Sequence, residues 1–129
     1  MAIHPIAVHF GIVCDEVRRE DSGKLFMIGV YGHDISVASF PARLALTLVI
    51  SLLAKSPVDD HPLEVQTEFD GETIHSGRGL ISINDAGINL IVLPGIVVPA
   101  AKAGELTFKA KAGAGRWKVM AKIPLQART

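Results

Sequence analysis

Apolar side chains occupy every second position through much of this sequence, and that spacing limits the folds available to it. The stretch from residue 43 to residue 54 shows the spacing most clearly, with large apolar side chains at alternate positions: Leu44, Leu46, Leu48, Ile50 and Leu52. A helix places apolar residues three or four positions apart, whereas a period of two is typical of a β-strand. The leucine and alanine content would also allow a helix, but the alternation favours a strand.

Segments with this alternation recur at intervals of roughly ten residues and are separated by turn signals. The Asp-Gly pair at residues 70–71 suits a two-residue hairpin, and the Asp-Ser-Gly run at residues 21–23 suits a three-residue loop with its glycine at positive φ. The pattern predicts an all-β fold, an antiparallel two-sheet β-sandwich (immunoglobulin-like or C2-like) of about eight or nine strands. Because no linker is visible, we expect residues 1–129 to form one domain.

The first hairpin, residues 10–31, is predicted to centre the core. Alternation places five apolar side chains on one of its faces: Ile12, Cys14, Phe26, Ile28 and Val30. Toward the N-terminus the same face is predicted to continue through Phe10, Val8 and Ile6. The rest of the chain would have to cover this face. Across the turn, Glu20 is expected to face Lys24 and form an ion pair that helps to set the register.

The last hairpin, residues 104–123, shows the same alternation. Its inward-facing side chains are predicted to be Leu106, Phe108, Ala110, Trp117, Val119, Ala121 and Ile123. By contrast, the Ser-Gly-Arg-Gly run at residues 76–79 interrupts the strand pattern, and we expect a break or a bulge there.

Charged residues are unevenly distributed. The whole chain is neutral, with 13 basic and 13 acidic residues, which gives no general attraction for nucleic acid or anionic membranes. From Lys102 onward, however, there are seven basic residues and one acidic residue, a net charge of +6. Alternation places five of these basic residues on one solvent face of the last hairpin: Lys109, Lys111, Arg116, Lys118 and Lys122.

Three interpretations of this basic face remain open. Lysines on an edge hairpin can block edge-to-edge aggregation. They can also complement the acidic strand that carries Glu64 and Glu68, within one molecule or between subunits, and in the second case the protein would self-associate. The third interpretation is a surface for anions or nucleic acid. Nucleic acid is the less expected partner, because Phe108 and Trp117 are predicted to point inward and leave no stacking platform.

The run of residues 15–20, at the tip of the first hairpin, is the densest in charge, with acids on both sides of Arg18 and Arg19. In one interpretation these charges are solvated ion pairs at the end of a hairpin. In the other, exposed charges of both signs on a rigid hairpin dock a protein partner.

Five residues in predicted loops are candidates for a metal site: His33, Asp34, Asp59, Asp60 and His61. Carboxylates and imidazoles together can bind a divalent cation. Their spacing matches neither HExxH nor an EF-hand loop, so solvated loops are the simpler interpretation and no cofactor is expected. Cys14 is the only cysteine and is predicted to face the core, where a thiol behaves as a small hydrophobe and not as a nucleophile.

No export or membrane signal is visible in the sequence. The N-terminus has no basic region before its first apolar residues. The uncharged stretch over residues 86–101 would allow a membrane span only if it were longer and free of its two prolines. We therefore expect a soluble, cytoplasmic protein.

Residues 14–32, CDEVRREDSGKLFMIGVYG, resemble the opening of a family of small uncharacterised bacterial proteins, a domain of unknown function. The similar features are an acidic-plus-arginine segment after an apolar strand, a Gly-Lys hairpin and a Gly-Val-Tyr-Gly close. Residues 104–108, GELTF, look like the penultimate strand of that family. The resemblance implies a β-sandwich in a bacterial cytoplasm and brings no activity, cofactor or catalytic residue with it.

These observations favour a non-enzymatic module that binds a protein partner or further copies of itself. The alternative is a small metal-dependent enzyme or ligand binder that uses the loop histidines and aspartates. Anion binding by the basic last hairpin is the third possibility.

Overall fold

The structure is a computed structural model that describes residues 5–128, and these residues form nine β-strands and no helix. The strands are β1 (Ile6–Arg19), β2 (Leu25–Val30), β3 (Ile35–Val37), β4 (Ala42–Ala54), β5 (Val58–Phe69), β6 (Glu72–Ile83), β7 (Gly87–Ala100), β8 (Gly104–Ala112) and β9 (Lys118–Ala127). The predicted all-β fold is confirmed, and so is the strand over residues 43–54. Over the described range, no helix is long and apolar enough to cross a membrane.

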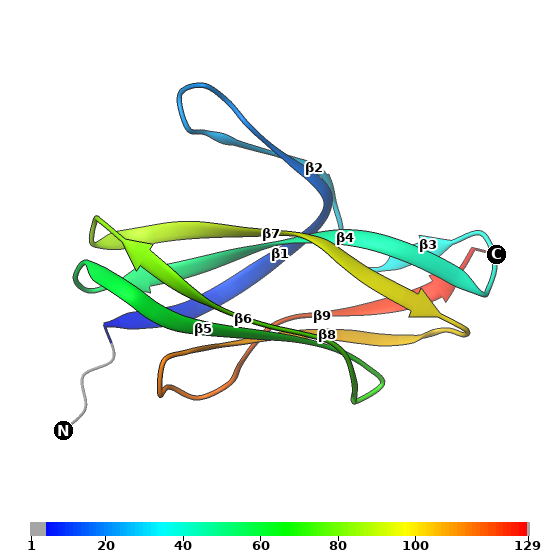
Figure 1. The fold of residues 1–129 in the computed structure, drawn as a ribbon. Coiled ribbons are helices and arrows are strands. Elements are labelled where there is room, and N and C mark those ends of the chain that lie inside the picture. The colour runs from blue at the N-terminus through cyan, green and yellow to red at the C-terminus, as the bar shows by residue number, and fades with distance from the viewer. Residues whose placement is uncertain (1–4, 129) are drawn as a thin grey trace.

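The strands form two layers (Figure 1). The four-strand sheet has the order β2-β1-β4-β7, and the five-strand sheet has the order β3-β9-β8-β5-β6. Neighbouring strands are antiparallel with one exception, because β3 runs parallel to β9 and Ile35 lies opposite Leu125. The predicted two-sheet arrangement is confirmed, and the one departure from antiparallel pairing is at this edge, where a strand of three residues makes a short parallel pairing.

Both predicted hairpin turns are confirmed by their backbone geometry. Asp70 and Gly71 have φ values of 49° and 85°, as a two-residue turn with two left-handed positions requires. Gly23 has a φ of 92° in the first hairpin, and its N–H donates to the Glu20 carbonyl at 2.9 Å. The predicted Glu20–Lys24 ion pair does not form; the Glu20 carboxylate accepts a hydrogen bond from Ser22 Oγ at 3.0 Å.

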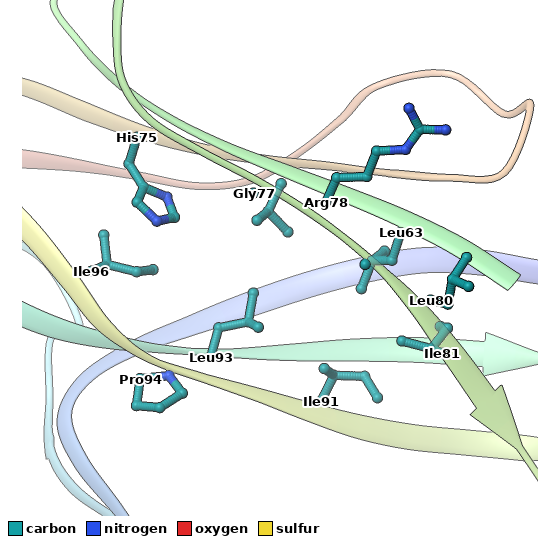
Figure 2. Close-up of a pocket in the computed structure, with 12 residues that line it drawn as sticks. Leu63, His75, Gly77, Arg78, Leu80, Ile81, Ile91, Leu93, Pro94 and Ile96 are labelled. Atoms are coloured by element: carbon teal, nitrogen blue, oxygen red, sulfur yellow. The ribbon is translucent and has the colours of Figure 1, made fainter. Parts of the chain in front are cut away.

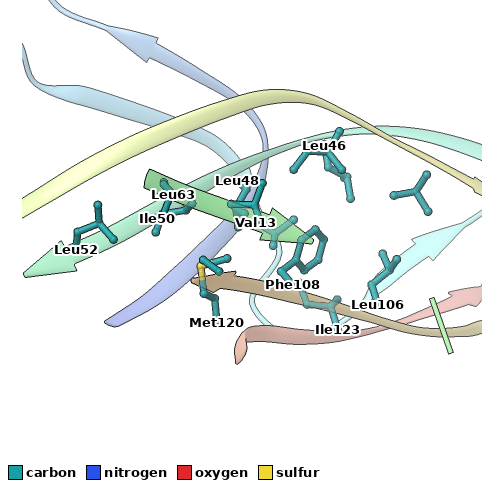
Figure 3. Packing of buried hydrophobic residues seen from close by; sticks show 14 of the residues in the cluster. Val13, Leu46, Leu48, Ile50, Leu52, Leu63, Leu106, Phe108, Met120 and Ile123 are labelled. Atoms are coloured by element: carbon teal, nitrogen blue, oxygen red, sulfur yellow. The ribbon is translucent and has the colours of Figure 1, made fainter. Parts of the chain in front are cut away.

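The core lies between the inner faces of the two sheets and is centred on β4 and β8 (Figure 3). The alternating residues Leu48, Ile50 and Leu52 of β4 are at most 1% exposed, and so is Phe108 of β8. The inward positions predicted for the first half of the last hairpin are thus confirmed. The central strand β4, paired on both sides, takes the organising role that the sequence had suggested for the first hairpin.

The first hairpin does not lie at the centre of the core, and this prediction is wrong. A bulge between Val8 and Phe10 changes the alternation, so that Ile6 is buried on the inner face while Phe10 is 49% exposed on the outer face. Beyond Cys14, β1 leaves β4 and pairs only with β2. This projecting part, residues 15–30, is called the arm below. It rises from the four-strand sheet on the side away from the five-strand sheet (Figure 1).

The second half of the last hairpin also departs from the prediction, because of a bulge between Phe108 and Lys109. The extra residue moves Met120 into the core, where it is 7% exposed. Trp117 and Val119, predicted to point inward, are 39% and 44% exposed.

The predicted interruption at residues 76–79 is absent, because β6 runs without a break from Glu72 to Ile83. The register of the β5–β6 pair shifts at two other places, between Val58 and His61 and between Thr67 and Glu68. Gly77 and Gly79 therefore occupy regular strand positions, opposite Val65 and Leu63, and face the interior.

Candidate functional site

The sandwich is open along one side, between the last strands of its two sheets. β6 ends the five-strand sheet and β7 ends the four-strand sheet. A cavity of about 370 Å³ lies between them and opens to solvent. Its lining is mainly apolar (Figure 2) and comes from three strands: Leu63 and Val65 of β5, His75, Gly77, Gly79 and Ile81 of β6, and Ile91, Leu93 and Ile96 of β7. This space is called the groove below.

The two inward glycines of β6 explain why the groove exists. A Cβ atom at Gly79 would meet no atom within 4 Å, and one at Gly77 would meet only Val65 Cγ2 at 3.3 Å and His75 Cε1 at 3.8 Å. Larger side chains at these strand positions would fill the space between the sheets. Their absence keeps Leu63 and Val65 of the next strand in contact with the groove.

His75 lines the groove and carries an unsatisfied polar atom. Its Nδ1 is buried and has no hydrogen-bond partner among the described residues. Buried polar atoms are nearly always paired, so an orphan nitrogen calls for a partner that is added by something else. Arg78 also lines the groove, but it directs its guanidinium away from the apolar residues (Figure 2). The groove is therefore apolar with one polar contact point.

The rims of the groove offer further hydrogen-bonding groups. An edge strand leaves a row of backbone N–H and C=O groups without partners in its own sheet. Here two such strands, 12 and 14 residues long, border the same groove. Pro94 and Gly95 interrupt the regular edge of β7, whereas β6 contains no proline. The longer uninterrupted edge is thus that of β6.

The candidate metal ligands do not come together. His33 and Asp34 precede β3, and the Asp34 carboxylate accepts hydrogen bonds from Ser36 Oγ at 3.2 Å and Gln126 Nε2 at 2.6 Å. The predicted loop that holds Asp59, Asp60 and His61 is instead the beginning of β5. The two groups are separated in the chain by β4, a strand of 13 residues that is roughly 40 Å long. Within residues 5–128 no three His, Cys, Asp or Glu side chains are placed to hold a metal ion.

The basic and acidic strands meet within one molecule. Lys109 Nζ lies 3.0 Å from Glu68 Oε2, and Lys111 Nζ lies 3.1 Å from Glu64 Oε2. These pairs join β8 to β5, as the second interpretation of the basic face predicts for a single molecule. β8 lies inside the five-strand sheet, so Lys109 and Lys111 do not guard an edge. The ammonium of Lys111 also lies 5.3 Å from the centre of the Trp117 ring.

The other basic candidates do not complete one continuous face. The bulge in the last hairpin sets Val119, not Lys118, opposite Lys109. Arg116 lies in the connection before β9, and Lys122 lies opposite Thr107. All three are exposed.

The charges at the tip of the arm are exposed. Arg18 Nε lies 3.1 Å from Glu16 Oε1, and their side chains are 68% and 52% exposed. Arg19 lies opposite Leu25 in the hairpin. These residues stand on the part of the molecule that projects farthest from the two layers (Figure 1).

Cys14 is an unsuitable nucleophile. Its side chain is 0% exposed, and Sγ donates a weak hydrogen bond to the Glu16 carbonyl at 3.6 Å. Burial raises the pKa of the Cys14 thiol, which disfavours the reactive thiolate. The predicted burial of this residue is confirmed, but Cys14 lies opposite Thr47 on the outer side of the four-strand sheet and not between the sheets.

The sequence interpretation did not predict the groove, although the spacing of Gly77 and Gly79 was visible. Two glycines two positions apart share one face of a strand, and that spacing in an otherwise regular strand marks a place where side chains are missing from the interior. The resemblance of residues 14–32 to an uncharacterised bacterial family stays a prediction. A scan of the chain against protein-family models and a search of curated proteins both return no match.

Proposed function

We propose that this protein is a non-enzymatic binding module that accepts an extended peptide segment of a partner protein in the groove between β6 and β7. The observation that carries the proposal is the combination of an apolar cavity of about 370 Å³ with two edge strands along its rims. Addition of a strand to an exposed sheet edge is a recurring mode of peptide recognition. Backbone hydrogen bonds supply affinity in this mode, and pockets for alternate side chains supply specificity.

The lining indicates the chemistry of the segment. Apart from Arg78, whose guanidinium points away, the lining is mainly apolar, with side chains such as Leu63 and Ile91, so we expect apolar residues to enter the groove. Every second residue of an extended segment would face the groove, and the others would face solvent. A polar group of the segment would meet the imidazole of His75, which lines the groove. The predicted ligand is an extended segment with alternating apolar residues and an uncharged polar group near His75.

The direct test is selection of ten-residue peptides from a displayed random library, followed by titration calorimetry with the selected peptides. We expect enriched sequences with apolar residues at alternate positions. Hydrogen exchange should show new protection of β6 amides when such a peptide binds, because those N–H groups gain partners. Failure to select any peptide, or binding without new protection at either edge strand, would contradict the proposal.

A matched pair of variants separates the groove from the rest of the surface. In Gly79→Val the added side chain enters the groove, meets no atom within 4 Å at its Cβ, and should abolish peptide binding without unfolding the protein. Ser76→Val adds the same side chain to the same strand at an exposed position and should leave binding unchanged. Gly79→Ala provides a milder second variant with an intermediate loss of affinity. Equal binding by all three variants would exclude the groove as the site.

A small apolar ligand would use the same cavity differently. The volume lies within the range of small-molecule sites, but such a ligand needs none of the edge backbone groups. Binding of decanoate that is blocked by Gly79→Val, in the absence of any peptide binding, would favour this second function over the first.

The two other functions predicted from the sequence have less support. A metal-dependent enzyme would need His33, Asp34 and the Asp59–His61 group in one place, and they lie on either side of β4 in the chain. An anion-binding face would need free lysines, whereas Lys109 and Lys111 are paired with acids of β5.

A further inference from the structure

A second surface, independent of the groove, lies on the outer face of the four-strand sheet. Seven of the large apolar side chains with substantial exposure belong to this face or to its continuation on the arm: Phe10, Phe26, Ile28, Val30, Ile88, Leu90 and Val97. Strand register places them on one side, since Phe10 and Leu90 both lie opposite Ser51, and Val30 lies opposite Cys14. The part of the chain that the structure describes lays no strand over this face (Figure 1).

The residues at the centre of this outer face are buried and uncharged, like those of a protein core. Val49, Thr47 and Ser51 of β4 point to the outer side and are at most 5% exposed, because neighbouring side chains of β1 and β7 surround them. From residue 44 to residue 54 and from residue 86 to residue 101 no residue carries a charge. A sheet that is apolar on both faces normally has a layer on each side.

The exposed apolar area of the face is a large part of what one partner buries in a standard interface. The seven side chains together expose on the order of 500 Å² of apolar surface. The half-buried Ile12, Leu53 and Val92 lie on the same face and extend it. A standard interface needs about 800 Å² from each partner, roughly a tenth of the surface of a small protein. The exposed surface of this chain is 7698 Å², and a tenth of it is about 770 Å², so the seven side chains supply about two thirds of one partner's share before the half-buried residues are added.

The arm has no layer to pack on within its own molecule. A two-stranded hairpin is marginally stable by itself in water. The arm nevertheless has a fixed base, where the Tyr31 hydroxyl donates to the Asp15 carboxylate and Thr47 Oγ1 donates to the Asp15 carbonyl at 3.4 Å. Its apolar side, with Phe26 and Ile28, continues the outer face of the sheet. A surface that covers the sheet would therefore also stabilise the arm.

The charges of the arm indicate which partner fits. Glu16 lies opposite Ile28 and Arg18 lies opposite Phe26, so an acid and a base stand two positions apart on the apolar side of the arm. In a contact between two copies related by a two-fold axis, residue i of one copy meets residue j of the other and the reverse also holds. Antiparallel arms would then place Glu16 of each copy beside Arg18 of the other. The pattern is complementary to itself.

We infer that the outer face of the four-strand sheet, together with the arm, binds a second copy of this chain in a two-fold symmetric dimer. Each arm lies along the partner's arm and over the partner's sheet. The uncharged sheet faces supply the apolar centre of the interface, and the Glu16 and Arg18 pairs supply its register. This dimer differs from an association of oppositely charged faces, because its centre is apolar. Within each arm Arg18 Nε lies 3.1 Å from Glu16 Oε1, and this pair would exchange partners across the two-fold axis.

The test is the mass of the full chain in solution, measured by light scattering and sedimentation over a range of concentrations. We expect a dimer for the natural sequence. Ile88→Glu on the sheet and Phe26→Asp on the arm should each give monomers, with dissociation constants raised at least a hundredfold. Val119→Glu is the matched control, since Val119 is as exposed as Ile28 but belongs to the five-strand sheet, and it should remain dimeric.

Charge reversal distinguishes a second copy from a different protein partner. Arg18→Glu places acids at both position 16 and position 18 on the apolar side of each arm and should weaken the dimer about tenfold or more. The double variant Glu16→Arg with Arg18→Glu restores both signs and should recover the dimer, because the reversed pattern is again complementary to itself. A monomer at every concentration, a dimer that survives both Ile88→Glu and Phe26→Asp, or a failure of the double variant to recover would each overturn the inference. Peptide binding in the groove is expected to be the same in these variants, so the two proposals can fail separately.

Discussion

The outer faces of the two sheets are built on the same alternation but with different side chains. The five-strand sheet presents Glu64 and Glu68 beside Lys111 and Lys109, and each of these long side chains reaches an opposite charge on the next strand. The four-strand sheet presents valine, leucine, isoleucine and phenylalanine at the corresponding positions. The outer face of the five-strand sheet thus carries paired charges that suit contact with water. The outer face of the four-strand sheet carries apolar side chains of the kind found in a core.

This difference shows that alternation along a strand does not by itself tell which side of a sheet is covered. In the five-strand sheet the polar side is the outer side, as the usual pattern of a half-buried strand requires. In β4 both sides are buried, although only the inner side faces the other sheet. The same substitution should therefore change the free energy of unfolding by different amounts on the two faces.

The largest expected difference comes from placing one carboxylate on each face. Val49→Glu introduces a charge at a position that is 1% exposed and has no basic neighbour on β4. We expect the free energy of unfolding to fall by about 3 kcal/mol or more, the cost of an unpaired buried charge. Gln66→Glu introduces the same group opposite Lys109 and should change stability by less than about 1 kcal/mol. Urea denaturation of both variants at one protein concentration measures the contrast, and equal losses would show that the faces are alike.

A smaller effect is expected at the base of the arm, whose direction decides how far the apolar face extends. Gly29 has a φ of 70°, and a Cβ there would collide with the Asp15 carboxylate. Gly29→Ala should cost about 1–3 kcal/mol through backbone strain and increase hydrogen exchange in the arm. Gly32→Ala is the control, because a Cβ at Gly32 would meet no atom within 4 Å. If both substitutions are neutral, the arm is not fixed by this contact.

The ion pairs give a finer comparison between the five-strand sheet and the arm. Lys109 and Glu68 have side chains that are 27% and 17% exposed, whereas Arg18 and Glu16 are mostly solvated. Double-mutant cycles with alanine should give a coupling of about 1 kcal/mol for the first pair and under about 0.5 kcal/mol for the second. Both couplings should shrink in high salt, the second more completely. A larger coupling in the arm of the monomeric variant Ile88→Glu would reverse this ranking.

The sequence predicted the layers of this protein better than its irregularities. Period-two patterning identified the strand over residues 43–54 against a competing helix, and turn chemistry identified the Asp70-Gly71 and Gly23 turns. Strand interiors between bulges follow simple alternation, which is why Leu106 and Phe108 were placed correctly. These features depend on residues close together in the chain.

The wrong predictions of which side chains face inward came from features that alternation cannot show. Two bulges changed which residues face inward, exposing Phe10 in one case and burying Met120 in the other. A bulge is decided by the pairing of distant strands, so no local pattern predicts it. The groove depends on which strands end each sheet, and the sequence did not show that β6 and β7 would lie on the same side. The Gly77-x-Gly79 spacing was visible, but its meaning required that arrangement.

A further prediction tests the base of the arm through the proton equilibrium of Tyr31. Burial, reinforced by the hydrogen bond to the negatively charged Asp15, raises the pKa of Tyr31 to about 12. The unfolded chain should ionise near the ordinary tyrosine pKa of about 10. The stabilisation from neutral Tyr31 is therefore complete below pH 10 and is lost as the pH rises toward 12. Tyr31→Phe should remove this part of the alkaline destabilisation and leave the rest.

Tyr31 is the only tyrosine, so the near-ultraviolet absorbance of tyrosinate reports on this side chain alone. We expect a titration midpoint well above that of the urea-unfolded chain, and a lower midpoint in Asp15→Asn, because the carboxylate that disfavours tyrosinate is then neutral. A folded midpoint equal to the unfolded one would mean that the Tyr31–Asp15 contact does not persist in solution. The arm would then lack a fixed base, and the apolar face would end at the edge of the sheet. The contrast between the two outer faces would remain, but the dimer would have to form without the arms.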